Sequence, residues 1–332
     1  MRGAVVPGAA GDGGETAAAR TTVLPAAGEL ALLLAAGTAL SWLMTGHVFG
    51  RANNVFHLPI VAGLAARPGF ESDAYVQSLA GFASGLWMLL EGSDAHWPAP
   101  LLFATGLAAS KALTLAGALA VARALGLAGR WPSAAFVAVL ATTPLLQGTA
   151  YAGHGGLFID TFSHSELANG LTLFLWWALL TRRFGTAAAL LGGVAFLNVF
   201  MAVWSVPAFV AALVAAVRAA GGGAGGAADG AGRAMGPAPE RQLRPLRAGA
   251  LGAGVLVGAL LFAPVAVRLL ALAGSADAPA LDLRAFVRDY YPYHFLADEM
   301  PARQWLGLAA VLAAAVTGLR WLDAPGAPHG AA

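Results

Sequence analysis

The residues best suited to chemistry in this chain are two neighbouring acids, Glu71 and Asp73, in the stretch FESDAYV. A pair of carboxylates could act as a general base or hold a divalent metal ion. Asp73 also directly precedes an apolar helical stretch, where it would make a good N-cap. The residues alone favour capping over catalysis for Asp73.

Two histidines and a third acid lie in two other polar stretches. His57 belongs to GHVFGRANNVFHLP, and His164 and Glu166 belong to FSHSELANG. Ser163 and Glu166 have the spacing of a capping box, which gives Glu166 a structural explanation. The histidines have no metal-ligand spacing, so ordinary hydrogen bonding is the alternative to substrate binding for them.

A further group of polar residues lies in LDLRAFVRDYYPYHF, near the C-terminus. Apolar residues at helical spacing predict an amphipathic helix over 281–291, ended by Pro292. Simple anchoring at a membrane interface would explain this helix. Alternatively, its polar side would bind a phosphate-bearing lipid head group, because arginine suits phosphate. The predicted polar rim consists of Arg284, Arg288, Tyr291 and His294.

Two polar residues fall inside long apolar blocks. Lys111 is the one lysine of the chain, and Asn198 interrupts GGVAFLNVFMAVW. A charge within a membrane is a functional candidate by default. Lys111 is therefore expected to face the interior of a helix bundle or a water-filled cavity.

The composition shows which elements must position these residues. Of the 332 residues, 58% are hydrophobic and 11% are charged, against roughly 25% charged in soluble domains. Mean hydropathy is +0.70. A soluble protein this apolar would lack a surface for water, whereas lipid accepts apolar side chains. The chain is predicted to be an all-α, polytopic transmembrane helix bundle. It has no cysteine, which excludes disulfides and thiolate chemistry.

Eight apolar blocks are predicted to span a membrane, since a bilayer core needs about 20 helical residues. The region 185–218 is either two short spans with a turn near Trp204–Pro207 or one long tilted helix. Residues 74–90 are predicted to form a helix at the outer interface. The predicted spans are 26–46, 98–122, 131–148, 167–181, 185–201, 204–218, 248–272 and 303–321.

Arginine placement predicts the orientation. With a cytoplasmic N-terminus, twelve arginines fall on the inner side and five in outer loops, as the positive-inside rule requires. Both termini are therefore expected in the cytoplasm of a bacterium, with the chain in its inner membrane. The predicted segments are a disordered tail 1–25, six spans in 26–218 with a long outer loop 47–98, a disordered Gly/Arg linker 219–247, two spans in 248–322, and a tail 323–332.

Three stretches together resemble an uncharacterised family of bacterial multi-pass membrane proteins. They are GHVFGRANNVFHLP with FESDAYV, FSHSELANGLTLFLWW with GGVAFLNVFMAVW, and FVRDYYPYHF. In architecture this family is similar to type C glycosyltransferases, which take sugars from polyprenyl-phosphate carriers. The resemblance implies an essential acid in the first outer loop, so Asp73, or Glu71, would be the catalytic base.

Two functions remain open from the sequence. One is a glycosyltransferase, a hexosyl or pentosyl transferase, which uses a lipid-linked sugar on the outer face. The other is a non-enzymatic transporter or lipid-binding membrane protein, with Lys111 and Asn198 lining a pathway. The expected partners are membrane lipid and a polyprenyl-phosphate-linked sugar. Nucleic acid is not expected, because the basic linker lacks interleaved aromatic residues. No cofactor is evident, although the acid pair is compatible with a divalent metal.

Overall fold

The structure is a computed structural model that describes residues 27–79, 81–146, 157–222, 247–274, 288 and 302–323. Within these residues the chain is helical with connecting turns, and no strand occurs, which confirms the all-α prediction. The longer helices are α1 (Ala27–Thr45), α5 (Ala99–Ala124), α6 (Arg130–Ala141), α7 (His164–Leu180), α8 (Phe184–Leu197), α9 (Val199–Gly222), α10 (Ala248–Gly274) and α13 (Ala302–Asp323). The shorter ones are α2 (Asn54–Val61), α3 (Ala74–Leu79) and α4 (Gly85–Leu90), with 3₁₀ turns η1 (Leu64–Ala66), η2 (Ser93–Ala95) and η3 (Thr143–Leu146).

Four helices of the described chain are long and apolar enough to cross a membrane. They are Ala27–Thr45, Ala99–Ala124, Val199–Arg218 and Ala248–Leu272. Large apolar side chains on them face outward, such as Leu43 at 76% exposure and Trp204 at 81%. Such exposed apolar faces suit lipid. The helices are therefore compatible with an integral membrane protein, as predicted, with four of the eight expected spans reaching this length.

The expected span 131–148 is interrupted by proline. The helix α6 has 12 residues and stops at Ala141, after which Thr143–Leu146 form a 3₁₀ turn. Pro144 lies in this turn, and proline lacks the N–H of an α-helical hydrogen bond. The apolar block is thus shorter as a helix than hydropathy indicated.

The predicted turn near Trp204–Pro207 is wrong, because the chain reverses earlier. Asn198 is extended, with φ −148° and ψ 105°, and separates α8 from α9. The side-chain Oδ1 of Asn198 accepts a hydrogen bond from the backbone N of Met201, 3.3 Å away, as an N-cap does. Pro207 lies inside α9. The region 185–218 therefore forms two helices.

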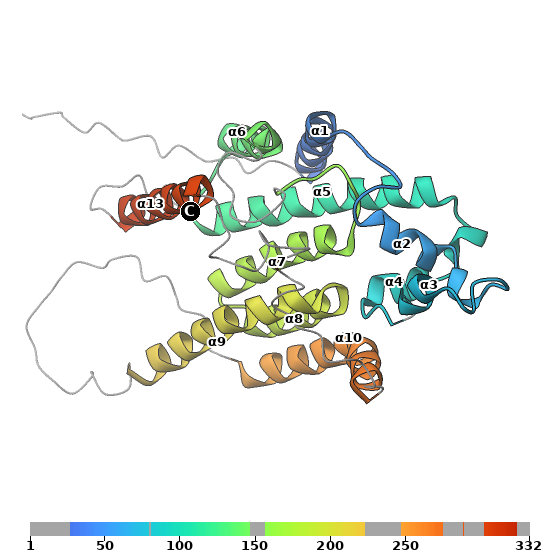
Figure 1. The fold of residues 1–332 in the computed structure, drawn as a ribbon. Helices are drawn as coiled ribbons and strands as arrows, with labels where there is room; N and C mark the ends of the chain where they lie inside the picture. The colour runs from blue at the N-terminus through green and yellow to red at the C-terminus, as the bar shows by residue number, and fades with distance from the viewer. Residues whose placement is uncertain are drawn as a thin grey trace, which may run out of the picture.

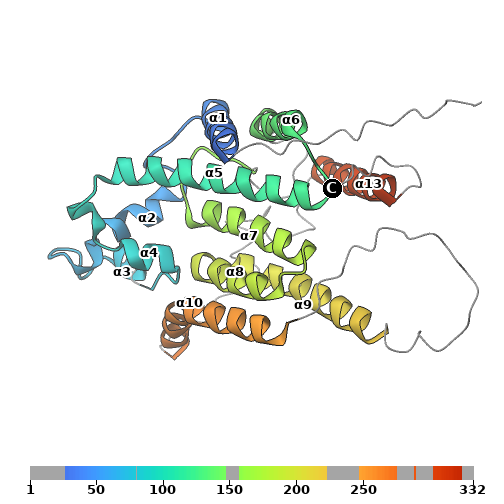
Figure 2. The same ribbon diagram turned by 180° about the vertical axis from the view of Figure 1, so that it is seen from behind.

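Long helices are stacked in layers. Figure 1 shows α5, α7, α8 and α10 following one another, and the view from behind in Figure 2 keeps that order. The loop predicted to lie on the outer side forms α2, α3 and α4 at one end of the stack. We call this folded segment, residues 46–98, the outer cap, after its predicted side of the membrane. The helices α1 and α6 pack against α5 and are seen nearly end-on in Figure 1, so they cross it steeply.

The stretch 74–90 forms two six-residue helices, α3 and α4, in place of the predicted single helix. Ser84 between them is extended, and its hydroxyl donates to the Leu197 carbonyl at 2.8 Å. A six-residue helix is about 9 Å long, too short to span a bilayer. The segment thus belongs to the outer cap.

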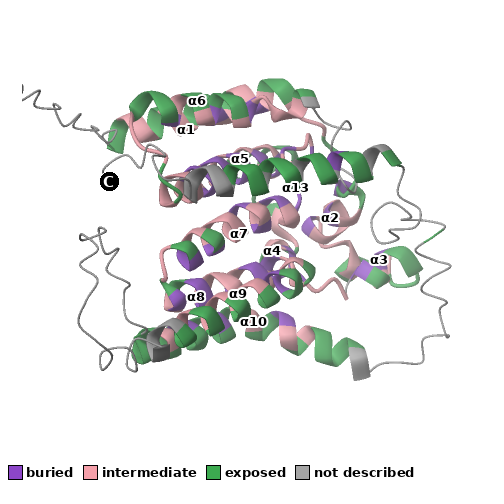
Figure 3. Cartoon of the chain, turned by 90° about the vertical axis from the view of Figure 1, so that its left-hand side faces the viewer, coloured by how far each residue is buried: buried purple, intermediate pink, exposed green. Residues whose placement is uncertain are grey.

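Buried residues gather between the layers, as the purple segments of α5, α7 and α8 show in Figure 3. The helices α8 and α10 touch through glycine: a Cβ added at Gly192 would lie 2.2 Å from the Cα of Gly258. Small residues let membrane helices approach this closely.

Several predicted segments lie partly or wholly outside the described residues. They are the tail 1–25, most of the amphipathic helix 281–291 and the tail 324–332. In the segment predicted as a linker, 219–247, the first four residues are helical because α9 continues to Gly222, and residues 223–246 are outside the described chain.

Candidate functional site

The outer cap is fastened to the segment that precedes α7. The backbone N of Val48 donates to the Asp160 carbonyl at 2.8 Å. The buried side chain of Asn54 donates to the Phe162 carbonyl at 3.0 Å and accepts from the N of Gly50 at 3.2 Å. Asn54 was not a candidate from sequence, although it lies in GRANNVFHLP. Its amide joins the two outer segments that carry the candidate histidines.

His57 and His164 come together around Trp87. The His57 ring stacks on Trp87 with centroids 4.0 Å apart, and it meets His164 edge-on at 5.4 Å. The Trp87 Nε1–H donates to His164 Nδ1 at 3.0 Å. His57 is 1% exposed and its Nδ1 has no hydrogen-bond partner in the described chain. The pair belongs to a buried aromatic cluster that joins the outer cap to α7.

His57 and His164 both lie outside the predicted membrane spans. Their burial controls whether they are charged. Burial lowers the pKa of His57 from 6.5 to about 3, with a smaller contribution from repulsion by His164. Burial also lowers the pKa of His164 to about 4. Both rings are therefore neutral at neutral pH. A neutral His164 is what the hydrogen bond from Trp87 requires, because Nδ1 must accept.

Lys111 lies inside the bundle, 2% exposed. Its Nζ donates to Thr45 Oγ1 and to the Ile159 carbonyl, both at 2.9 Å, and to Ser41 Oγ at 3.5 Å. Three acceptors match the three protons of an ammonium group. Lys111 thus ties α1 and the segment before α7 to α5.

Glu166 is a buried acid whose carboxylate interacts with Lys111. It is 8% exposed, and its carboxylate interacts electrostatically with the lysine, as does Asp160. The predicted capping box is not formed. Ser163 occupies the N-cap position, but its buried hydroxyl makes no hydrogen bond in the described chain. Glu166 is therefore a buried acid near Lys111 and not part of a capping box.

Asn198 holds the break between α8 and α9 against the start of α7. Its Nδ2 donates to Ser165 Oγ at 2.9 Å, while its Oδ1 caps α9. Asn198 and Lys111 thus both form hydrogen bonds that connect different helices or loops, and these bonds stabilise the bundle.

Asp73 and Glu71 lie on the exposed surface of the outer cap. Asp73 Oδ1 accepts from the N of Val76 at 2.9 Å, the N-cap bond of α3. Glu71 Oε2 accepts from the N of Gly69 at 2.8 Å. The structure thus places Asp73 where the capping interpretation expected it. It brings His57 and His164 together, but records no contact between Asp73 and that pair.

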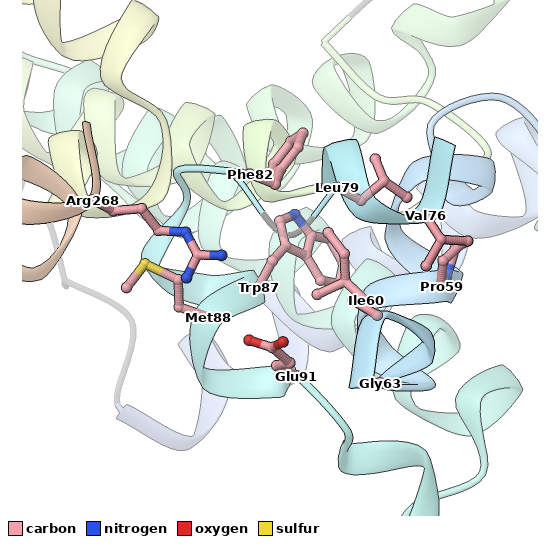
Figure 4. Close-up of a pocket in the computed structure, with 11 residues that line it drawn as sticks. Pro59, Ile60, Gly63, Val76, Leu79, Phe82, Trp87, Met88, Glu91 and Arg268 are labelled. Atoms are coloured by element: carbon pink, nitrogen blue, oxygen red, sulfur yellow. The ribbon is translucent and has the colours of Figure 1, made fainter. Parts of the chain in front are cut away.

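A crevice opens where the outer cap meets α10, and Figure 4 shows its walls. Arg268 reaches from α10 toward Trp87 and Met88, and Glu91 lies below the indole in this view. No ion pair joins these charges in the described chain. The space out to the mouth is about 350 Å³, but the enclosed part is about 10 Å³, room for roughly one water. A larger ligand would sit at the mouth.

The predicted arginine rim is largely outside the described residues. Arg284, Tyr291 and His294 lie there, and Arg288 is described singly, as an exposed helical residue. Three or more His, Asp or Glu residues placed to hold a metal ion do not occur together in the described ranges. Arg268 and Glu91 were missed because only the packing of α10 against α4 brings them together.

Comparisons with known proteins add no relative: no family model, curated protein or solved structure matches this chain.

Proposed function

We propose that this membrane protein is a glycosyltransferase-like enzyme that uses a lipid-phosphate-linked sugar at the outer cap. The observation that carries the proposal is the crevice between the outer cap and α10. It combines the Arg268 guanidinium with the apolar and aromatic walls of Ile60, Phe82 and Trp87. A planar guanidinium binds phosphate oxygens in pairs, and apolar walls suit a lipid chain.

The helix α3 links this crevice to the predicted base. Val76 and Leu79 of α3 line the crevice, and Asp73 caps the first turn of the same helix. One carboxylate oxygen of Asp73 makes the cap bond, which leaves the other for an acceptor. The exposed carboxylate, three residues before the crevice-lining Val76, would be accessible to an acceptor hydroxyl arriving from outside the membrane.

The proposed reaction is a displacement at the anomeric carbon of the donor sugar. The acceptor oxygen forms a bond to that carbon while the bond between the carbon and the phosphate oxygen breaks. Asp73 takes the acceptor proton, and the lipid phosphate departs with the bonding electrons, held by Arg268. The protein would act in a bacterial inner membrane, with both termini cytoplasmic.

A second candidate is lipid binding without chemistry. The cap bond from Asp73 to Val76 favours it, because that bond explains Asp73 without catalysis. The same crevice would then hold a lipid phosphate only. A transport pathway along Lys111 and Asn198 is less well supported, since both side chains are engaged in hydrogen bonds between helices.

The test compares two aspartates of the outer cap, each of which accepts a hydrogen bond from a backbone N–H at the start of a helix. Asp94 Oδ1 accepts from the N of Ala99 at 3.1 Å, so Asp94→Asn is a matched control for Asp73→Asn. Asparagine caps about as well as aspartate. In membranes supplied with polyprenyl-phosphate sugars, Asp73→Asn should lower transfer at least roughly a hundredfold, with an unchanged melting temperature, while Asp94→Asn keeps activity.

Full activity of the Asp73→Asn variant would remove the base assignment. If the wild type transfers no sugar while Arg268→Gln weakens binding of polyprenyl phosphate, the lipid-binding candidate is correct. If Arg268→Gln changes neither transfer nor binding, the crevice is not the lipid site.

A further inference from the structure

A second cleft lies at the end of the bundle opposite the outer cap, between the α7–α8 turn and the start of α10. Its volume is about 810 Å³. Three arginines line it, two from the turn and one from the residue before α10. They are Arg182, Arg183 and Arg247. No carboxylate is among the lining residues, and the ion pair recorded in the described chain is elsewhere, between Arg130 and Glu29.

Apart from Thr186 and two glycines, the remaining walls of this cleft are apolar side chains. Phe184 of α8 and Ala253 and Val257 of α10 contribute to them, and Val257 is 47% exposed. At the bottom of the cleft, α8 and α10 are in close contact at two glycines, since a Cβ on Gly254 would collide with the Gly185 backbone. The cleft is therefore positive at its mouth and apolar along one side. A ligand that fits it carries a negative head and an apolar tail.

The backbone at Arg182 supplies an independent observation. Arg182 has φ +55°, in the left-handed region that favours glycine. Its N donates to the Leu179 carbonyl at 3.0 Å, and the N of Arg183 donates to Ala178 at 2.7 Å. This is the Schellman motif, in which glycine is the usual residue at this position. An arginine is present in a strained conformation where glycine would fit better, as residues with a function often are.

Arg183 is held in place beside it. Its guanidinium lies over the Trp177 ring, 4.7 Å from the centroid. Stacking on a ring face leaves the guanidinium N–H groups available to an acceptor. The turn thus holds the Arg183 guanidinium on a ring and the Arg182 backbone in a defined conformation. Arg247, the residue before α10, lines the same cleft.

We propose that this cleft binds the head group of an anionic phospholipid. The arginine-rich end is the one that the positive-inside rule assigns to the cytoplasm. Basic pockets between membrane helices on that side fit anionic lipid head groups. The site is separate from the outer crevice, so it does not depend on the proposed transferase activity.

The first test measures binding of short-chain phosphatidylglycerol to the full chain in neutral detergent. Arg183→Gln with Arg247→Gln should weaken binding roughly thirtyfold, since each arginine contributes about tenfold or less. Arg123→Gln with Arg218→Gln removes equal charge from the same end outside the cleft, and should change binding less than about twofold. Phosphatidylcholine should bind at least roughly tenfold more weakly, and inorganic phosphate should not compete. Equal loss in both pairs, or displacement by inorganic phosphate, would overturn the proposal.

The second test separates folding from binding. Arg182→Gly should raise the melting temperature, because glycine relieves the positive φ, and should weaken phosphatidylglycerol binding several-fold. Ala52→Gly is the matched control, since Ala52 is the other described non-glycine residue with positive φ, at 49°. It should also raise the melting temperature but leave binding unchanged. If Arg182→Gly binds phosphatidylglycerol as the wild type does, Arg182 is not part of a lipid site.

Discussion

The two ends of this helix bundle handle polar groups in opposite ways. At the outer end, Lys111, Glu166, Asn54 and Asn198 are buried or part-buried and interact with other parts of the chain. At the opposite end, arginines line an open cleft without a carboxylate among its walls. Burial forces a polar group to find a partner nearby, because an unpaired group in an apolar surrounding is costly. An open cleft imposes no such demand.

This difference indicates where external ligands are needed. The polar network at the outer end is complete apart from a few atoms, and it stabilises the joint between the outer cap and the bundle. Within the described chain, no side-chain hydrogen bond or ion pair is recorded for the three arginines that line the cleft. A mutation at the outer end should therefore affect folding first, and a mutation in the cleft should affect binding first.

Replacing Lys111 should give the largest loss of stability. Lys111→Met removes the donor to Thr45, Ser41 and the Ile159 carbonyl. Each buried acceptor left without a partner costs about 1–3 kcal/mol. We expect a lower melting temperature in detergent and loss of folded protein from membranes. Arg218→Met, on an exposed arginine of α9, is the control and should be almost silent. A Lys111→Met variant as stable as the control would show that the network is not structural.

Acidification should weaken the outer cap next. The pKa of His57 is about 3 in the folded chain against 6.5 for the free side chain. Between these values the unfolded chain binds a proton that the folded chain does not. The contribution of neutral His57 to the free energy of unfolding is therefore fully present above pH about 6.5. It declines as the pH falls toward 3, by up to about 1.4 kcal/mol per pH unit.

The matched variant is His57→Phe, which keeps a ring on Trp87 but cannot titrate. Melting temperatures measured from pH 7 to pH 4.5 should fall less steeply for this variant than for the wild type. Identical pH profiles would mean that His57 is accessible to protons in the folded state and that the stacked, buried position is incorrect.

A glycine contact between α8 and α10 should give an intermediate effect. A Cβ at Gly192 would lie 2.2 Å from the Gly258 Cα, whereas one at Gly193 would lie 3.6 Å from a Leu171 methyl carbon. Gly192→Ala should therefore destabilise the bundle by about 1–3 kcal/mol, although alanine favours helix formation. Gly193→Ala should be neutral or stabilising. Equal thermal stability of the two variants would contradict the close approach of the helices.

Hydropathy predicted where the long helices lie but not where they end. The apolar block after Arg130 continues through Pro144, so composition extended the helix past the proline that stops it. The sequence pattern does not reveal the reversal at Asn198, because Trp204 and Pro207 give the stronger turn signal. A proline inside a membrane helix can be tolerated by neighbouring groups, whereas Asn198 both ends one helix and caps the next.

The sequence predicted individual candidate residues of the site, but not the contacts that bring them together. His57 and His164 stood out as residues, yet their contact depends on Trp87, which no local pattern connects to them. Arg268 and Glu91 line one crevice because α10 packs beside α4, a long-range contact that spacing along the chain does not reveal. The left-handed Arg182 was also unpredictable, since glycine is the residue that normally indicates such a turn.

The smallest expected changes in stability come from the residues that precede two helices, α7 and α9. Ser163 and Asn198 both precede helices, and the sequence rule assigns each a capping role worth about 1 kcal/mol. In the structure the Ser163 hydroxyl is buried and unbonded, while Asn198 bonds both Met201 and Ser165. Ser163→Ala removes a buried polar group without breaking a bond, so it should leave thermal stability unchanged or slightly higher. Asn198→Ala breaks two hydrogen bonds and should lower stability by about 1–2 kcal/mol. A loss of about 1 kcal/mol for Ser163→Ala would instead mean that the predicted capping box forms in the membrane, with Glu166 turned toward the helix start and away from Lys111.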